Sequence, residues 1–266
     1  MAAPTEDRVE VRGTEIHVCS GGNGPPLLFL HGAGGGEWMP FMDALCTDFH
    51  VIAPDHPGFG LSADVDWLEK PADLAWFYLD YMDAMGLEGV HLVGSSLGGW
   101  VASEIACHGT DRLASLTLVS PAGLYVPDAA IGDLFIWNRE EVAQNLFVDP
   151  AFTQAFLSRP MDEAALDIVL KNRLTSARLL WAPRLHDPHL GKWLHRIDVP
   201  TFVVWGADDK VISVEHAAGF ADAIPDARLE IFPQCGHLPF VEKADMFVAA
   251  FKKFVTEMTV SGEAAS

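Results

Sequence analysis

The sequence predicts an α/β fold, in which a mostly parallel central sheet is flanked by helices and interrupted by a helical insert. Short apolar runs alternate with helix-like segments over residues 27–119, the alternation stops at Pro121, and it resumes near residue 200. Continuous apolar runs are typical of strands buried on both faces. Strand–helix alternation is typical of a parallel sheet with right-handed crossovers.

The first elements follow in order along the chain. Polar and apolar residues alternate over 8–12 and again over 15–18, with a tight break at 13–14 between them. This pattern predicts a hairpin. Strands are then expected at 27–30, 50–53, 90–93 and 116–119, and helices around 38–45, at 71–85 and at 97–108. The helix at 71–85 has Pro71 in its first turn and Gly86 directly after its last turn, which is typical of helix boundaries.

The stretch 121–195 differs from the rest of the chain, because it shows no evident strand and is rich in Trp and Phe on helix-like segments. Strands are expected again at 200–205 and 228–232, with helices at 214–224 and 244–256. We therefore expect an α/β core of residues 1–120 and 196–266, with residues 121–195 inserted as a helical cap.

The composition excludes several classes of protein. The chain has 266 residues, half of them hydrophobic, and a formal net charge of −20, so we expect a folded domain that does not bind nucleic acid. Residues 1–12 lack the apolar stretch of a signal peptide, and no apolar run reaches the ~20 residues that span a bilayer. The four cysteines are far apart, which favours reduced thiols. We expect a cytoplasmic protein without a membrane partner; its oligomeric state is open, with a homodimer as one option.

The strongest chemical signal is Gly94-Ser95-Ser96-Leu97-Gly98, which lies between an expected strand and an expected helix and matches G-x-S-x-G. A strand that turns at once into a helix leaves the central side chain exposed on a strained turn. Small residues are needed two positions before and after it, and glycine stands at both. Ser96 is therefore the expected nucleophile.

A serine nucleophile needs a base that an acid orients, and two later loops supply both. Asp208 and Asp209 follow the strand at 200–205, and His237 follows the strand at 228–232. The carboxyl ends of parallel strands open on one edge of a sheet, where ligands bind. We therefore expect Ser96, one of the two aspartates and His237 to meet at that edge.

The glycine-rich run His31–Gly36 also follows a strand. Acyl transfer needs two backbone N–H groups that face the developing oxyanion, and we assign them to Ala33 and to Leu97, the residue after the nucleophile. No GxxxxGK[ST] phosphate loop is present, and the proline within His186–His189 favours a surface turn over a metal site. We expect neither an organic cofactor nor a metal.

The chain resembles α/β-hydrolase-fold enzymes that carry a cap, over about residues 9–255 and more weakly over 121–195. The motifs that carry the resemblance are LLFLHGAGGG, VIAPDHPGFGLS, HLVGSSLGGW, VVWGADDKVIS and FPQCGHLPFVE. In the family pattern G-x-x-D the acid stands three residues after the glycine, which implies Asp209 rather than Asp208. A serine at position 96 excludes the branches that use an aspartate nucleophile.

Two branches of the family are the most similar: small carboxylesterases, and hydrolases that cleave C–C bonds in meta-fission products of aromatic degradation. The second group typically has Asn before the nucleophile and Trp after the histidine, where this chain has Ser95 and Leu238. It also uses a cap arginine for the substrate carboxylate, and Arg173 is the candidate counterpart.

We expect the cap to supply an apolar pocket for an aromatic or medium-chain acyl group. The residues expected to contact substrate are Gly34, Ser95, Trp137, Phe147, Arg173 and Leu238. The primary hypothesis is a serine hydrolase that cleaves a carboxylic ester through an acyl-enzyme. The alternatives are a C–C hydrolase of diketone acids, a non-catalytic ligand-binding protein, and a cofactor-free oxygenase or perhydrolase. The expected partner is a small-molecule ester or ketone substrate.

Overall fold

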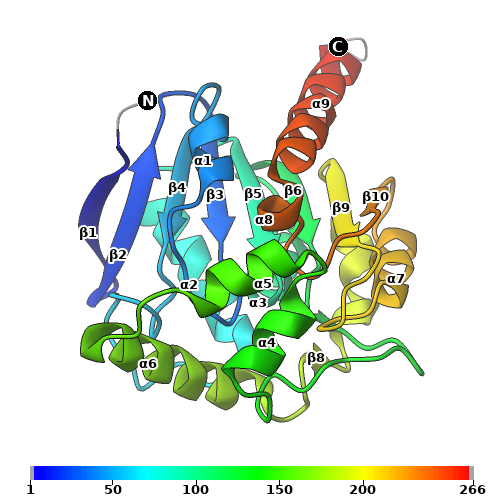
Figure 1. The fold of residues 1–266 in the computed structure, drawn as a ribbon. Helices are drawn as coiled ribbons and strands as arrows, with labels where there is room; N and C mark the ends of the chain where they lie inside the picture. The colour runs from blue at the N-terminus through cyan, green and yellow to red at the C-terminus, as the bar shows by residue number, and fades with distance from the viewer. Residues whose placement is uncertain (1–2, 264–266) are drawn as a thin grey trace.

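An eight-stranded sheet forms the centre of the computed structural model, which describes residues 3–263 (Figure 1). Its strand order is β1-β2-β4-β3-β5-β6-β9-β10. The first two pairings, β1 with β2 and β2 with β4, are antiparallel, and the others are parallel. The strands are β1 (Thr5–Val11), β2 (Thr14–Gly21), β3 (Pro26–Leu30), β4 (His50–Pro54), β5 (Val90–Ser95), β6 (Leu113–Val119), β9 (Thr201–Gly206) and β10 (Arg228–Phe232). The predicted fold class is confirmed.

Helices cover both faces of the sheet and bury a separate apolar core on each. The first core holds α2 (Pro71–Ala84), α3 (Leu97–His108) and α7 (Glu215–Ala223), and the second holds α1 (Pro40–Leu45), α8 (Pro239–Glu242) and α9 (Ala244–Glu263). Within β3, Leu28 and Leu30 belong to the first core, while Leu27 and Phe29 belong to the second. This two-residue period explains why the strand is a continuous apolar run.

The segment between β6 and β9 leaves the sheet and lies at the carboxyl ends of the parallel strands, where α4, α5 and α6 gather below the strand arrowheads (Figure 1). We call this segment the lid. Its elements are β7 (Gly123–Leu124), α4 (Arg139–Leu146), α5 (Pro150–Leu157), α6 (Glu163–Leu180), β8 (His186–Asp187) and the 3-10 helices η1 (Leu190–Lys192) and η2 (Leu194–Arg196).

The expectation that the insert contains no strand was wrong, because β7 and β8 form a two-residue parallel pair. A pair this short has no readable periodicity, since its pairing depends on where the two ends of the lid return to the core. Residues 1–2 and 264–266, which we assigned to the core, lie outside the described residues. All four cysteines are free thiols. In residues 3–263, no helix has the length and hydropathy needed to cross a membrane.

Candidate active site

Ser96 is the single residue between the end of β5 and the start of α3. Its backbone has φ 53° and ψ −114°, a region that residues with a side chain rarely occupy. The surrounding backbone holds this conformation, because the Ser96 carbonyl accepts hydrogen bonds from the amides of Trp100 (3.0 Å) and Ala122 (3.0 Å). The strained turn predicted from the sequence is therefore present at the predicted residue.

The two glycines of the motif are required by contact distances. A Cβ atom on Gly94 would lie 2.3 Å from the carbonyl oxygen of Gly98. A Cβ atom on Gly98 would lie 2.0 Å from the carbonyl oxygen of Leu30, at the end of β3. The turn can therefore form only where both positions lack a side chain.

Asp209 and His237 meet after β9 and β10, with 2.8 Å between Oδ2 and Nδ1. The other carboxylate oxygen, Oδ1, accepts the amides of Val211 (2.8 Å) and Ile212 (3.0 Å). The Asp209 side chain is fully buried and that of His237 is 4% exposed. An ionised carboxylate only accepts hydrogen bonds, so Nδ1 of His237 carries the proton and Nε2 is left as a base.

Asp208 takes a different position. Its amide donates to the Cys235 carbonyl (2.9 Å), and its side chain is exposed and faces a groove on the surface. The structure therefore brings Asp209, and not Asp208, to His237. Because β5, β9 and β10 run parallel in one sheet, Ser96, Asp209 and His237 follow strand ends at the same edge.

The loop between β10 and α8, which carries His237 and which we call the histidine loop, is bound to the lid by the carboxylate of Glu242. Glu242 is 9% exposed. Its Oε2 accepts the amide of Gly236 (2.6 Å), and its Oε1 accepts the lid amides of Val148 (2.8 Å) and Asp149 (2.9 Å). The amide of His237 itself donates to the carbonyl of Leu146 (2.9 Å). Contacts from both the core and the lid therefore hold His237 in position.

The glycine-rich loop after β3 is held in a tight turn. The carbonyl of Gly32 accepts the amide of Gly35 (3.1 Å) and Nδ1–H of His31 (2.7 Å). Two hydrogen bonds on one carbonyl polarise its peptide group, which strengthens the N–H of the next residue, Ala33, as a donor. Within residues 3–263, neither the amide of Ala33 nor that of Leu97 donates to a protein acceptor.

A buried network fixes the tautomer of His31. Its Nε2 accepts the amide of His56 (2.9 Å), so its proton is on Nδ1. His56 in turn lies 2.6 Å from the hydroxyl of Tyr78 and 2.9 Å from the carbonyl of His31. Burial lowers the pKa of His31 and lowers that of His56 further, so both rings are neutral near pH 7.

Polar residues of α6 also reach the sheet edge that carries Ser96, and the sequence pattern did not single them out. Asn172 donates to the Gly34 carbonyl (2.9 Å), Thr175 to the Gly58 carbonyl (2.7 Å) and Ser176 to the Ala33 carbonyl (2.8 Å). The available signal was the spacing 172, 175 and 176, which places three small polar side chains on one face of a helix. Glu242 had a weaker signal, as a carboxylate within an apolar run.

The residues expected to contact substrate have varied surroundings. Ser95 is buried, and its Oγ finds no hydrogen-bond partner among the residues that the structure describes. Phe147 is buried beside the rings of Phe152 and Phe156. Arg173 is exposed and donates to the carbonyl of the half-buried Trp137 (3.2 Å).

Gly34 and Leu238 complete that set. The Gly34 carbonyl is taken by the side chain of Asn172. Leu238 is half-buried and packs against the second core. Contact with substrate remains a prediction for all six residues.

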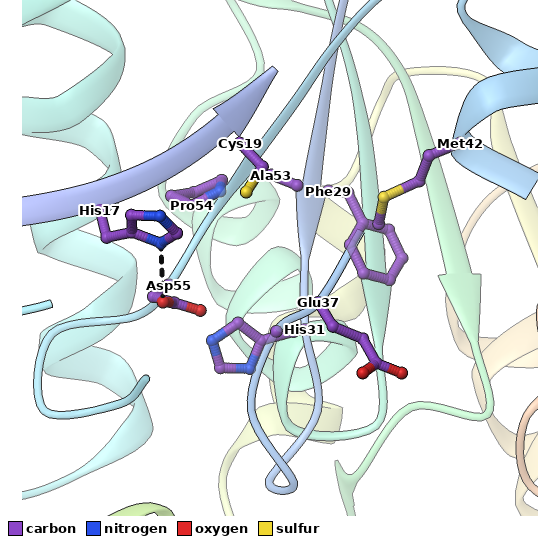
Figure 2. A pocket seen from close by; sticks show the side chains of 10 residues that line it. His17, Cys19, Phe29, His31, Glu37, Met42, Ala53, Pro54 and Asp55 are labelled. Carbon is purple, nitrogen blue, oxygen red and sulfur yellow. Dashed lines mark hydrogen bonds and ion pairs between the residues drawn. The ribbon is translucent and has the colours of Figure 1, made fainter. Parts of the chain in front are cut away.

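Two hollows lie near this edge, and neither Ser96 nor His237 lines them. The first borders the glycine-rich loop and has a volume of about 40 Å³, which is too small for an ester substrate. Figure 2 shows His17 bonded to Asp55 at one wall of it, with His31 and Glu37 at another. The second is an open groove of about 430 Å³ between the α4–α5 part of the lid and residues 208 and 210. In the described part of the chain, no three His, Cys, Asp or Glu side chains are grouped to hold a metal ion.

Comparisons with known proteins agree with this architecture. Residues 27–250, which include Ser96, Asp209 and His237, match the model of the alpha/beta hydrolase family. A dihydrolipoyllysine-residue acetyltransferase component of an acetoin cleaving system, from Cupriavidus necator, is 31% identical over 95% of this chain and 69% of its own length. A 2-hydroxy-6-oxo-6-phenylhexa-2,4-dienoate hydrolase from Comamonas testosteroni is 33% identical over 87% of this chain and 88% of its own.

One solved structure, a membrane phospholipase A described as a bacterial virulence factor, superposes with a TM-score of 0.83 at 26% identity. The superposition covers 97% of this chain and 87% of the phospholipase chain. The likeness therefore extends through the lid as well as the core.

Proposed function

This chain belongs to the alpha/beta hydrolase family, and from that premise we propose that it hydrolyses a neutral carboxylic ester through an acyl-enzyme on Ser96. The observation that carries the proposal is the buried 2.8 Å hydrogen bond between Asp209 and His237, at the sheet edge where Ser96 occupies its strained turn. A nucleophile, an oriented base and two unengaged amides are the components that acyl transfer needs.

The proposed reaction has two steps. His237 Nε2 takes the proton of Ser96 as its oxygen attacks the ester carbonyl, and Asp209 stabilises the imidazolium that forms. The amides of Ala33 and Leu97 face the oxyanion, and the alcohol leaves with the proton from His237. In the second step His237 takes a proton from a water molecule as its oxygen attacks the acyl carbonyl. The bond to Ser96 Oγ then breaks, His237 returns the proton to Ser96, and the acid is released.

Charge favours a neutral substrate over an anionic one. The chain has a net charge of −20, which repels anions as they approach. Every lysine and arginine of the lid is bonded to another group of the protein; they are Arg139, Arg159, Lys171, Arg173, Arg178, Arg184, Lys192 and Arg196. A carboxylate substrate would therefore have to compete for a cation of the lid.

A second candidate is hydrolysis of a C–C bond in a diketone acid, the branch favoured by the Comamonas testosteroni relative that is 33% identical to this chain. In this case the same serine, histidine and aspartate would act on a ketone. Arg173 would have to exchange the carbonyl of Trp137 for the substrate carboxylate.

The test is a panel of p-nitrophenyl and alkyl esters of increasing acyl length, run beside 2-hydroxy-6-oxo-6-phenylhexa-2,4-dienoate, with the native protein and Ser96→Ala. We expect ester turnover by the native protein and a loss of at least about three orders of magnitude in kcat for Ser96→Ala. Circular dichroism of the variant would show that the fold is retained.

Ser103→Ala is the matched control, because it deletes a buried hydroxyl of the adjacent helix α3 that bonds the Gly99 carbonyl, and we expect it to retain ester turnover. Faster turnover of the dienoate than of every ester would favour the second candidate. Undiminished ester turnover by Ser96→Ala would exclude an acyl-enzyme on Ser96.

A further inference from the structure

We propose that Asn172 and Ser176, on lid helix α6, are positioning residues that hold the oxyanion loop in its active geometry. The loop is the turn Gly32–Gly35, which carries the Ala33 amide. The inference rests on the proposed function, because it assigns these side chains a part in stabilising the oxyanion of the same reaction.

Asn172 joins the oxyanion loop to a second loop. Its Nδ2 donates to the carbonyl of Gly34 (2.9 Å), and its Oδ1 accepts the amide of Gly60 (2.9 Å). The residue is 4% exposed, so both hydrogen bonds form away from water. In a buried site an unsatisfied amide or carbonyl is costly, which makes this bridge specific.

Ser176 lies one helical turn after Asn172 and therefore on the same face of α6. Its hydroxyl donates to the carbonyl of Ala33 (2.8 Å), and the residue is 6% exposed. The loop is closely fitted to this face, because a Cβ atom on Gly35, where φ is +100°, would lie 2.3 Å from Nδ2 of Asn172.

Three successive carbonyls of the oxyanion loop are thus bonded from two sides. The core holds that of Gly32 through His31, and the lid holds those of Ala33 and Gly34 through Ser176 and Asn172. The Ala33 N–H shares a planar peptide group with the Gly32 carbonyl, which accepts the Gly35 amide. The Gly35 amide belongs to the peptide group whose carbonyl Asn172 holds, and Ser176 holds the peptide group between the two. The direction of the Ala33 N–H therefore depends on α6, and the lid takes part in arranging the oxyanion site as well as covering it.

An oxyanion donor acts mainly in the transition state, so a misdirected Ala33 amide lowers kcat and leaves KM nearly unchanged. Complete loss of one such donor costs about 10²–10³ in kcat. Loss of one of several anchors leaves the amide partly oriented. We therefore expect Asn172→Ala and Ser176→Ala each to lower kcat about tenfold, on the scale set by that full loss.

The experiment measures kcat and KM for the best ester of the panel, together with inhibition by an aryl trifluoromethyl ketone and by the product acid. The ketone forms a tetrahedral oxyanion on a serine, whereas the acid does not. We expect Asn172→Ala and Ser176→Ala to weaken ketone inhibition by about the factor lost in kcat, as for a transition-state analogue, and to leave acid inhibition unchanged.

Two variants are matched controls. Thr175→Val deletes a similarly buried hydroxyl on the same helix face, but one that bonds the Gly58 carbonyl outside the oxyanion loop. Asn145→Ala deletes a half-buried lid asparagine that bonds only within α4. We expect both to keep kcat within about twofold.

The inference is wrong if Asn172→Ala and Ser176→Ala keep kcat within about twofold while Ser96→Ala is inactive. It is also wrong if Thr175→Val lowers kcat and ketone affinity as much as Asn172→Ala and Ser176→Ala do. The loss would then come from a less stable α6 and not from the hydrogen bonds to the oxyanion loop. Should Asn172→Ala fail to fold, Ser176→Ala, which deletes a single oxygen atom, decides the question. Ester turnover by Ser96→Ala would instead overturn the proposed function.

Discussion

At the scale of single residues, the two oxygens of Asp209 have separate partners. One accepts the backbone of the turn that follows, and the other accepts His237. The backbone bonds set the rotation of the carboxylate, so the oxygen that faces the imidazole has a defined direction. Asp208 lacks this arrangement although it is adjacent in the sequence, because its side chain faces the surface groove.

Asp209→Asn therefore tests the assignment against Asp208→Asn. An asparagine at 209 can present its NH₂ group to His237 and favour the wrong tautomer, so we expect kcat to fall by about three to four orders of magnitude. For Asp208→Asn we expect kcat within about threefold of the native protein. The measurement is steady-state ester hydrolysis, and inactivity of Asp208→Asn alone would reverse the assignment.

At the scale of elements, several contacts attach the lid to the core, and two groups of them lie beside the candidate site. The α4–α5 connection is bound to the histidine loop through Glu242, and α6 is bound to the glycine-rich loop. Two residues after α5, Arg159 pairs with Glu37 through both carboxylate oxygens (2.8 Å each). The lid is therefore anchored beside both His237 and the glycine-rich loop.

Glu242→Ala would leave three amides without an acceptor, the buried amide of Gly236 and the part-buried amides of Val148 and Asp149. We expect this variant to lower the free energy of unfolding by about 1–3 kcal/mol, since an orphaned buried donor is costly. Glu163→Gln, which changes an exposed carboxylate in the first turn of α6, is the control and should stay within about 0.5 kcal/mol of the native protein.

Urea unfolding of both variants is the measurement. An unfolding midpoint for Glu242→Ala equal to that of the native protein would show that the Glu242 carboxylate does not stabilise the lid.

At the scale of the whole molecule, burial makes stability depend on pH. Burial lowers the pKa of His31, His56, His91 and His216 below the ordinary value of 6.5. In the unfolded chain these rings bind protons below about pH 6.5, whereas in the folded protein they bind them only at lower pH. The unfolded state therefore gains protons first, and the stabilisation present above pH 6.5 is lost as pH falls through the folded values.

We expect the free energy of unfolding to decrease from pH 7 to pH 5, with each of these histidines contributing up to about 1.4 kcal/mol per pH unit. His91→Asn, which removes one titrating ring but keeps a polar group beside Ser115, should show a smaller decrease. Urea unfolding at several pH values measures both curves. A native stability that is constant or rises between pH 7 and pH 5 would contradict the expectation.

Local chemistry made much of this protein readable from its sequence. The apolar run of β3 indicates a strand because alternate residues enter two cores, and the glycines around Ser96 are required by contacts within one strand–helix turn. Asp209 and His237 could be assigned to the sheet edge that carries Ser96 because strands that run parallel end at one edge. These inferences need only the geometry of neighbouring residues and of the sheet.

Only the tertiary structure decided how the lid takes part in the site. The two-residue pair β7–β8, the hydrogen bonds of Glu242 to Val148 and Asp149, and those of Asn172 to Gly34 and Gly60 join residues that are far apart in the chain. A single polar side chain in a helix has many potential partners, and periodicity does not select among them. Its partner is set by how the folded elements pack, which is why these contacts could not be predicted from local pattern.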